Sequence, residues 1–136
     1  FHIVFKASPR NFCCRSFHEA ADKLNNLLVI LESKSGQVFG GFSTESWAVP
    51  QNSVFGCNKL SNTFLFANNV ILRPKNKYEA IGCSMNNGPC FGLADIIVGN
   101  LNISNVCQFP LTYKPDTNGV VSTPVQLAGG KTFSLE

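Results

Sequence analysis

The stretch Gly36-Gln-Val-Phe-Gly-Gly-Phe-Ser-Thr-Glu-Ser-Trp47 decides the fold of this chain. Its valine and phenylalanines favour a β-strand, and two adjacent glycines, Gly40 and Gly41, interrupt them at the centre. A glycine pair inside an apolar strand indicates that a backbone or a large side chain packs very close to it. Trp47 is the only tryptophan, and we expect its indole to fill that space. A tight core contact is the favoured interpretation; a loop approaching a ligand is the alternative, although no Lys-Ser/Thr follows as in a phosphate-binding loop.

The segments around this stretch predict more strands. Leu27 to Leu31 is an unbroken apolar run, which is typical of a strand covered on both faces. Ser33 to Gly36 then predicts a hairpin turn that pairs this strand with the glycine strand. We expect further short strands at residues 63–67, 70–72, 78–81, 91–98 and 109–113, and the opening of an unfinished last strand at 133–136.

The N-terminal part predicts one strand and the only convincing helix. Phe1 to Lys6 has β character, and Ser8 can cap a helix whose first position is Pro9 and which ends near Leu24. Several short strands, one helix and no βαβ alternation indicate an α+β, mainly β domain, either antiparallel α+β or a β-sandwich.

Length and composition indicate one folded domain spanning residues 1–136. A chain of 136 residues with 44% apolar and 14% charged residues can form a hydrophobic core and is not disordered. The net charge of +3 is mild, and we read the basic run Arg73 to Lys77 as a solvated loop rather than a nucleic-acid footprint. The sequence contains no run of about 20 apolar residues and no leader pattern. Because it lacks an initiator Met, we expect a piece of a longer chain.

The six cysteines form no Cys-x-x-Cys pair, and neither histidine lies near two of them at a zinc-binding spacing. Three disulfides would suit a secreted protein. A domain of this size with twelve phenylalanines does not need such bridges, so free thiols in a reducing compartment are the favoured reading.

Few groups could carry catalysis. His18 and Asp22 lie four residues apart on one predicted helix face, where we expect them to tie the helix to a neighbouring strand rather than to act on a substrate. Asp95 is expected to make turn hydrogen bonds near Gly92, and Cys90 is the candidate for a reactive thiol. We assign no catalytic residue, cofactor or metal site.

Read together, six landmarks resemble the TLDc domain family over essentially the whole chain. They are Phe17-His18 with Asp22, Leu28 to Leu31, Gly40-Gly41-Phe42 with Ser46-Trp47, Phe64-Leu65-Phe66, Gly88-Pro89-x-Phe91-Gly92 with Asp95-Ile96, and Leu127-Ala128-Gly129 with Phe133 and Glu136. The chain departs from the family pattern at Ala21, where a Cys is common, and at Leu93-Ala94, where further glycines are common.

The resemblance implies two antiparallel sheets packed as a β-sandwich with short helices at the ends. It also implies a cytoplasmic, non-enzymatic interaction domain linked to oxidation resistance, whose partner is a subunit of the vacuolar-type proton ATPase. We expect its binding surface near the Gly40–Gly41 strand and the Phe91–Gly92 turn. Two alternatives are a structural module in a larger, for example BTB-containing, assembly and a thiol-based antioxidant or hydrolase with a Cys/His site.

Overall fold

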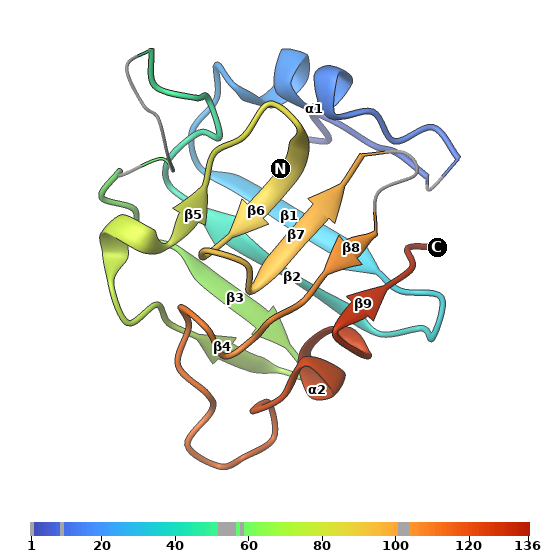
Figure 1. Ribbon diagram of the computed structural model, residues 1–136, viewed down its shortest axis with the longest axis vertical. Helices are drawn as coiled ribbons and strands as arrows, with labels where there is room; N and C mark the ends of the chain where they lie inside the picture. Colours follow the sequence, from blue (N-terminus) through green and yellow to red (C-terminus); the bar gives the residue numbers. More distant parts are fainter. Residues whose placement is uncertain (1, 9, 52–56, 58, 101–103) are drawn as a thin grey trace.

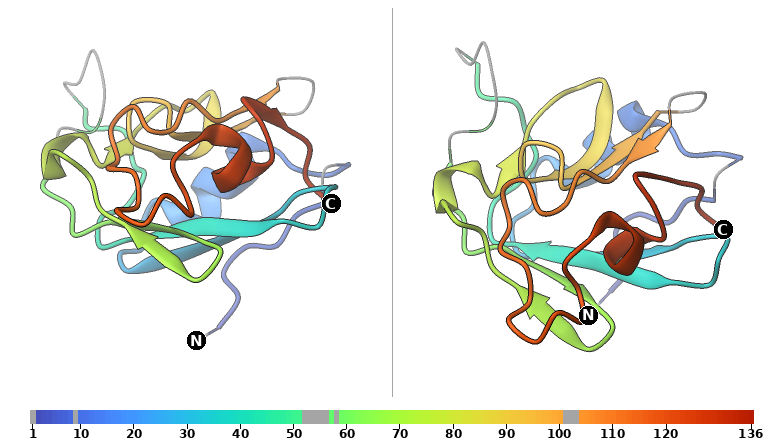
Figure 2. Two further views of the ribbon diagram at one scale, coloured as in Figure 1. Left: turned by 90° about the horizontal axis from the view of Figure 1, so that it is seen from below. Right: turned by 60° about the horizontal axis from the view of Figure 1, so that its bottom comes forward.

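The computed structural model describes residues 2–8, 10–51, 57, 59–100 and 104–136, which form two antiparallel sheets packed face to face (Figures 1 and 2). One sheet has the order β1-β2-β3-β4 and the other β5-β6-β7-β8-β9. The elements are α1 (Cys14–Ala21), β1 (Leu27–Glu32), β2 (Val38–Ser43), β3 (Phe64–Ala67), β4 (Val70–Leu72), a short 3-10 helix (Lys77–Glu79), β5 (Ile81–Gly82), β6 (Asn87–Phe91), β7 (Ile96–Gly99), β8 (Asn105–Val106), α2 (Pro124–Ala128) and β9 (Thr132–Phe133). The predicted mainly-β fold with short helices is confirmed.

The first sheet is built on the predicted hairpin. β1 pairs with β2 from Leu27 opposite Ser43 to Glu32 opposite Val38. The prediction that β1 is covered on both faces is wrong, because Ile30 keeps 64% of its surface exposed while Leu31 is buried. Only one face of this sheet packs against the second sheet, so alternate side chains of β1 remain in solvent.

The strand expected at 109–113 does not form. The backbone N–H groups of Thr112 and Tyr113 donate to the carboxylate of Asp95, at 2.8 and 3.1 Å, instead of to a neighbouring strand. Tyr113 keeps a single bridge to Pro74. The buried carboxylate of Asp95 therefore takes the place of a neighbouring strand as the hydrogen-bond acceptor for this segment.

The N-terminal segment also differs from expectation. Residues 2–8 form no strand, and α1 begins at Cys14 and ends at Ala21 rather than running from Ser8 to Leu24. The amide of Ser8 donates to Oδ1 of Asn11 at 2.6 Å, and this local turn competes with a helix start. The predicted first helical position, Pro9, lies outside the described residues.

The glycine pair does mark a very close contact, but its partner is Phe91 and not Trp47. A Cβ atom on Gly41 would lie 2.6 Å from Cε1 of Phe91, which comes from β6 of the facing sheet. Trp47 packs against Phe91 in a T-shaped arrangement, with 5.4 Å between ring centroids. Its Nε1 donates to the carbonyl of Cys90 at 2.9 Å. Both aromatic side chains are fully buried, so this contact lies at the centre of the sandwich.

We predict that Gly41→Ala destabilises the domain by about 1–3 kcal/mol, because the added methyl group overpacks a site closed by a rigid ring and the Phe64 carbonyl. Urea unfolding followed by tryptophan fluorescence measures this. Val38→Ala, on the same strand but half exposed, is the control and should cost less than about 1 kcal/mol. Equal effects of the two substitutions would contradict the packing argument.

Candidate functional site

Most of the predicted site residues lie inside the protein. Phe17, His18, Trp47, Phe91 and Asp95 are buried, as are Gly40, Gly41, Gly88, Pro89 and Gly92. Phe91 and Gly92 themselves are buried, whereas the next residue of the turn, Leu93, is 63% exposed, so the binding surface expected near this turn stays a prediction. Asp22, Phe42, Phe64 and Phe66 are partly exposed, and the three phenylalanines share one face of the first sheet.

His18 joins α1 to the turn between β5 and β6. Its Nδ1 lies 2.8 Å from Oδ1 of Asp22, and its Nε2 lies 3.0 and 2.9 Å from the carbonyl oxygens of Ser84 and Asn87. Both ring nitrogens are therefore engaged by protein oxygens, one by a carboxylate and the other by two backbone carbonyls. With 3% of its surface exposed, the ring is occupied by protein partners, and the expected tie between the helix and its neighbour is confirmed.

Asp95 holds two distant backbone segments together. Each carboxylate oxygen accepts one N–H, from Thr112 and from Tyr113, and the Thr112 hydroxyl in turn accepts the N–H of Leu93. Burial raises the pKa of Asp95, and the hydrogen bonds to Tyr113 and Thr112 oppose that shift. The carboxylate lies beside Gly92, as predicted, and fixes the turn between β6 and β7.

We predict that Asp95→Asn costs about 1–3 kcal/mol of unfolding free energy, because the amide turns one N–H donor toward another donor in a buried site. The control Asp116→Asn changes an exposed carboxylate that also accepts a backbone N–H, from Val120, and should cost less than about 0.5 kcal/mol.

The pH dependence checks the same assignment. The pKa of Asp95 is higher in the folded state than in the unfolded state, so the folded state binds the carboxyl proton more tightly. The stability that this proton contributes is fully present below the ordinary aspartate pKa. It is lost as the pH rises through the raised pKa of the folded state. The stability difference between wild type and Asp95→Asn should therefore grow toward acid pH in urea titrations. A constant difference would contradict the buried carboxylate.

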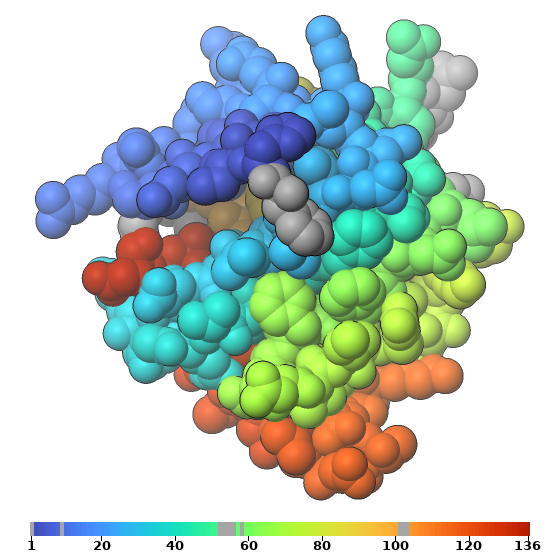
Figure 3. Space-filling model, turned by 180° about the vertical axis from the view of Figure 1, so that it is seen from behind, coloured from blue at the N-terminus to red at the C-terminus, as the bar shows by residue number. Residues whose placement is uncertain are grey.

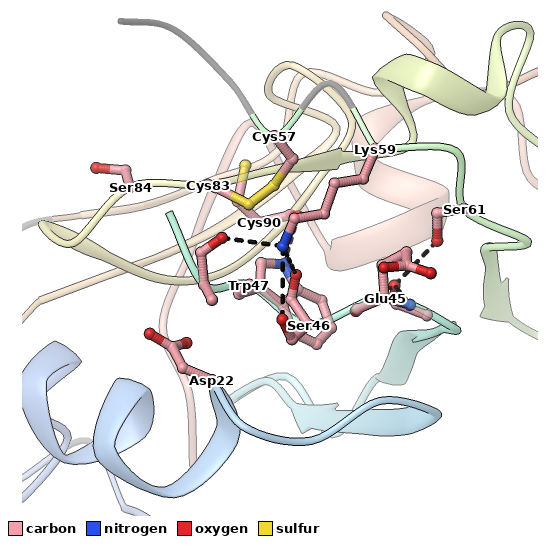
Figure 4. Close-up of a disulfide and its surroundings, with 12 residues drawn as sticks. Asp22, Glu45, Ser46, Trp47, Cys57, Lys59, Ser61, Cys83, Ser84 and Cys90 are labelled. Atoms are coloured by element: carbon pink, nitrogen blue, oxygen red, sulfur yellow. Dashed lines mark hydrogen bonds between the residues drawn. A yellow bond between two sulfur atoms is a disulfide. The ribbon is translucent and has the colours of Figure 1, made fainter. Parts of the chain in front are cut away.

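A disulfide joins Cys57 to Cys83, with 4.9 Å between their Cα atoms (Figure 4). The expectation of free thiols is wrong for these two residues, because the fold brings together two cysteines that are 26 residues apart, a contact that sequence spacing does not reveal. Close to this bridge, Nζ of Lys59 donates to the carbonyls of Ser46 and Ala48 at 3.0 and 2.9 Å (Figure 4).

The other four cysteines are free thiols with different environments. Burial raises the pKa of Cys90 to about 12 and that of Cys107 to about 11, and burial also raises the pKa of Cys14. Cys13 is exposed and precedes α1, where the backbone N–H of Ser16 lowers its pKa by favouring the thiolate. Among the described residues, no group of three or more His, Cys, Asp or Glu side chains could hold a metal ion.

We predict that alkylation of the native protein at pH 7 labels only Cys13 within minutes. Of the four free cysteines, Cys13 alone is exposed, and its lowered pKa gives it a larger thiolate fraction. Mass spectrometry of the labelled protein measures this, and Cys13→Ser should abolish the fast phase. In denaturant Cys14, Cys90 and Cys107 should react as well. Fast native labelling of Cys90 would contradict its burial.

Four large, exposed apolar side chains, those of Leu28, Ile30, Val38 and Ile71, lie on the outer face of the first sheet, which faces the viewer in Figure 3. We call this surface the outer sheet face; it consists of Leu28, Ile30, Glu32, Val38, Gly40, Phe42, Phe64, Phe66, Ile71 and Arg73. The exposed fractions are 44% for Leu28, 64% for Ile30, 50% for Val38 and 56% for Ile71. Several large exposed apolar side chains on one face are typical of an interaction surface.

Aromatic rings form the middle of the outer sheet face. Phe42 stacks on Phe64 with 5.5 Å between centroids, and the guanidinium of Arg73 lies 5.3 Å above the Phe64 ring. Phe66 leans over Gly40, so closely that a Cβ there would touch its ring at 3.0 Å. The glycine therefore leaves no hollow, and the face is flat.

The family model of the TLDc domain matches residues 1–136, the whole chain. The chain belongs to the TLDc domain family. No curated protein matches it. In this TLDc domain, the glycine pair, Phe91, Trp47 and Asp95 build the interior, and none of the described helices is long and apolar enough to cross a membrane.

The sequence predicted a binding surface near the Gly40–Gly41 strand, but it did not reveal the alternation along the four strands that defines the outer sheet face. Leu28 and Ile30, Phe42, and Phe64 and Phe66 alternate along their strands with inward-facing residues. The inward set is also apolar, so the alternation was hidden within continuous apolar runs.

Proposed function

We propose that this TLDc domain is a non-enzymatic protein-interaction module that binds its partner through the outer sheet face. The exposed apolar surface of β1 to β4 is the observation that carries the proposal, because exposed Leu, Ile, Val and Phe side chains on one face of a sheet are costly in water unless a partner covers them.

The groups that could perform chemistry support the non-enzymatic reading. His18 and Asp95 are committed to backbone partners, and Cys90 is a buried thiol. A cleft of about 450 Å³ lies beside the disulfide, and its ionisable lining residues outside that bridge are Tyr78, Glu79 and Cys90. These groups do not form a nucleophile and base pair of the kind that acyl transfer or hydrolysis requires.

We further propose, from the family resemblance, that the partner is a subunit of the vacuolar-type proton ATPase, that the domain acts in the cytoplasm and that it contributes to protection against oxidation. In a reducing compartment the Cys57–Cys83 bridge would form only under oxidising conditions. A thiol-based antioxidant is the second candidate function, favoured by the exposed, low-pKa Cys13.

A pulldown from lysate of the domain's own cells tests the proposal. The wild-type domain at low micromolar concentration should recover proton-ATPase subunits, and Ile30→Glu should lose them because it places a charge in the apolar face. Leu93→Glu, at an equally exposed position in the turn between β6 and β7, is the control and should retain them.

Recovery by both variants would contradict the outer sheet face as the binding site. Recovery of no ATPase subunit by a folded wild-type domain would contradict the partner. Peroxide consumption by the purified domain that Cys13→Ser abolishes would establish the antioxidant alternative instead.

A further inference from the structure

We propose that a second copy of this chain also occupies the outer sheet face, forming a weak twofold dimer in which the strands of the two faces cross at nearly a right angle. This inference rests on the proposed function, which assigns binding to the outer sheet face. It goes further by naming one partner for that face, a second copy of the chain, from the arrangement of the side chains on the face.

Edge pairing is partly closed on both sides of the first sheet, which favours contact through the face. On the β1 side, the N–H of Glu136 donates to the carbonyl of Glu32 at 2.8 Å, and that of Lys34 to the carbonyl of Ser134 at 2.9 Å. On the β4 side, the N–H of Lys114 donates to the carbonyl of Arg73 at 2.9 Å. A partner strand would have to displace these bonds to extend the sheet.

The two charges of the outer sheet face stand at opposite corners. Glu32 is the last residue of β1, and Arg73 directly follows β4. Leu72 pairs with Leu65, so extending this pairing by one residue places Arg73 opposite Phe64. With strands about 4.8 Å apart and about 3.4 Å per residue, these corners are about 20 Å apart. Two copies can be placed with their outer sheet faces against each other. A twofold axis in the plane between them, perpendicular to the line from Glu32 to Arg73, then places each glutamate beside the arginine of the other copy. The charge pattern is therefore self-complementary, as a closed dimer requires.

The same twofold axis also places apolar side chains of one copy against apolar side chains of the other. It passes over the centre of the face, between Gly40 and Phe66, where the surface is flat. From the strand spacings, Ile30 of one copy then faces the stacked pair Phe42 and Phe64 of the other. The most exposed aliphatic side chain of the face thus meets its largest aromatic surface.

The outer part of the face is matched as well. Val38 of one copy falls opposite Ile71 of the other, and both side chains are at least half exposed in the single chain. The operation turns the strand direction by about 90°, which is one of the two common arrangements of packed sheets. One symmetry operation thus places apolar groups on apolar groups and opposite charges together.

The size of the face predicts weak association. The strand spacings give a footprint of about 400 Å² per copy, or about 800 Å² in total, which is below the 1,200–2,000 Å² of stable complexes. We therefore expect a dissociation constant in the range of about 10 µM to about 1 mM.

Sedimentation velocity of the purified domain, from about 5 µM to about 1 mM, tests the dimer. The wild type should shift from monomer to dimer across this range. Ile30→Glu should weaken association at least about tenfold, whereas Leu93→Glu should leave it unchanged. A wild type that stays monomeric at every concentration, or equal effects of the two variants, would overturn the proposal.

A charge exchange tests the twofold pairing without touching the core. Glu32→Arg or Arg73→Glu alone puts like charges opposite each other and should weaken the dimer about three- to tenfold, and the double variant Glu32→Arg/Arg73→Glu should restore it. Both positions are exposed, so these variants should fold. Failure of the double variant to restore association would overturn the proposed geometry.

The two proposals can fail separately. Sedimentation uses the purified domain alone, so a strictly monomeric domain that still recovers ATPase subunits overturns only the dimer. A domain that dimerises but recovers no ATPase subunit overturns only the proposed partner.

Discussion

The ring of Phe91 lies against the bare backbone of Gly41, and this contact sets the distance between the two sheets. Any side chain at residue 41 would push β2 away from β6. Trp47 packs edge-to-face with the same ring, and its Nε1 donates to the neighbouring carbonyl of Cys90, so a second buried aromatic side chain holds Phe91 in place. Phe17 of α1 packs in turn against Trp47, with 5.9 Å between centroids, which fixes the helix to the same point.

The division of the first sheet into two faces follows from this packing. Side chains that point toward Phe91 are buried, and those that alternate with them have no partner within the described residues. In a sandwich of two sheets, the outer face of each sheet is in contact with water, and polar residues usually occupy it. In this domain the outer face of β1 to β4 is largely apolar instead, and its charges stand at the corners. The inward-facing residues of these strands therefore maintain the fold, while the outward-facing residues that alternate with them form the surface available for binding.

Part of this structure could be predicted from the sequence and part could not. The hairpin of β1 and β2, the close approach at Gly41 and the His18–Asp22 pair follow from local patterns, namely a turn between apolar runs, a glycine pair in a strand and a spacing of four in a helix. The identity of the ring on Gly41, the Cys57–Cys83 bridge and the hydrogen bonds from residues 112 and 113 to Asp95 depend on contacts between distant segments. Local periodicity carries no information on such contacts. A surface near the Gly40–Gly41 strand was expected, but its extent across four strands could not be read from the sequence, because both faces of these strands are apolar.

Methyl NMR of the domain over a dilution series tests most directly the claim that the outer sheet face of one copy binds that of another, while the inner face holds the fold. Leu28 and Ile30 of β1 and Ile71 of β4 point outward, whereas Leu31 of β1, Leu65 of β3 and Leu72 of β4 point inward. The account predicts concentration-dependent shifts for the outward methyl groups and constant shifts for the inward ones. Shifts confined to the second sheet, or no shifts in the outward set at any concentration, would contradict it.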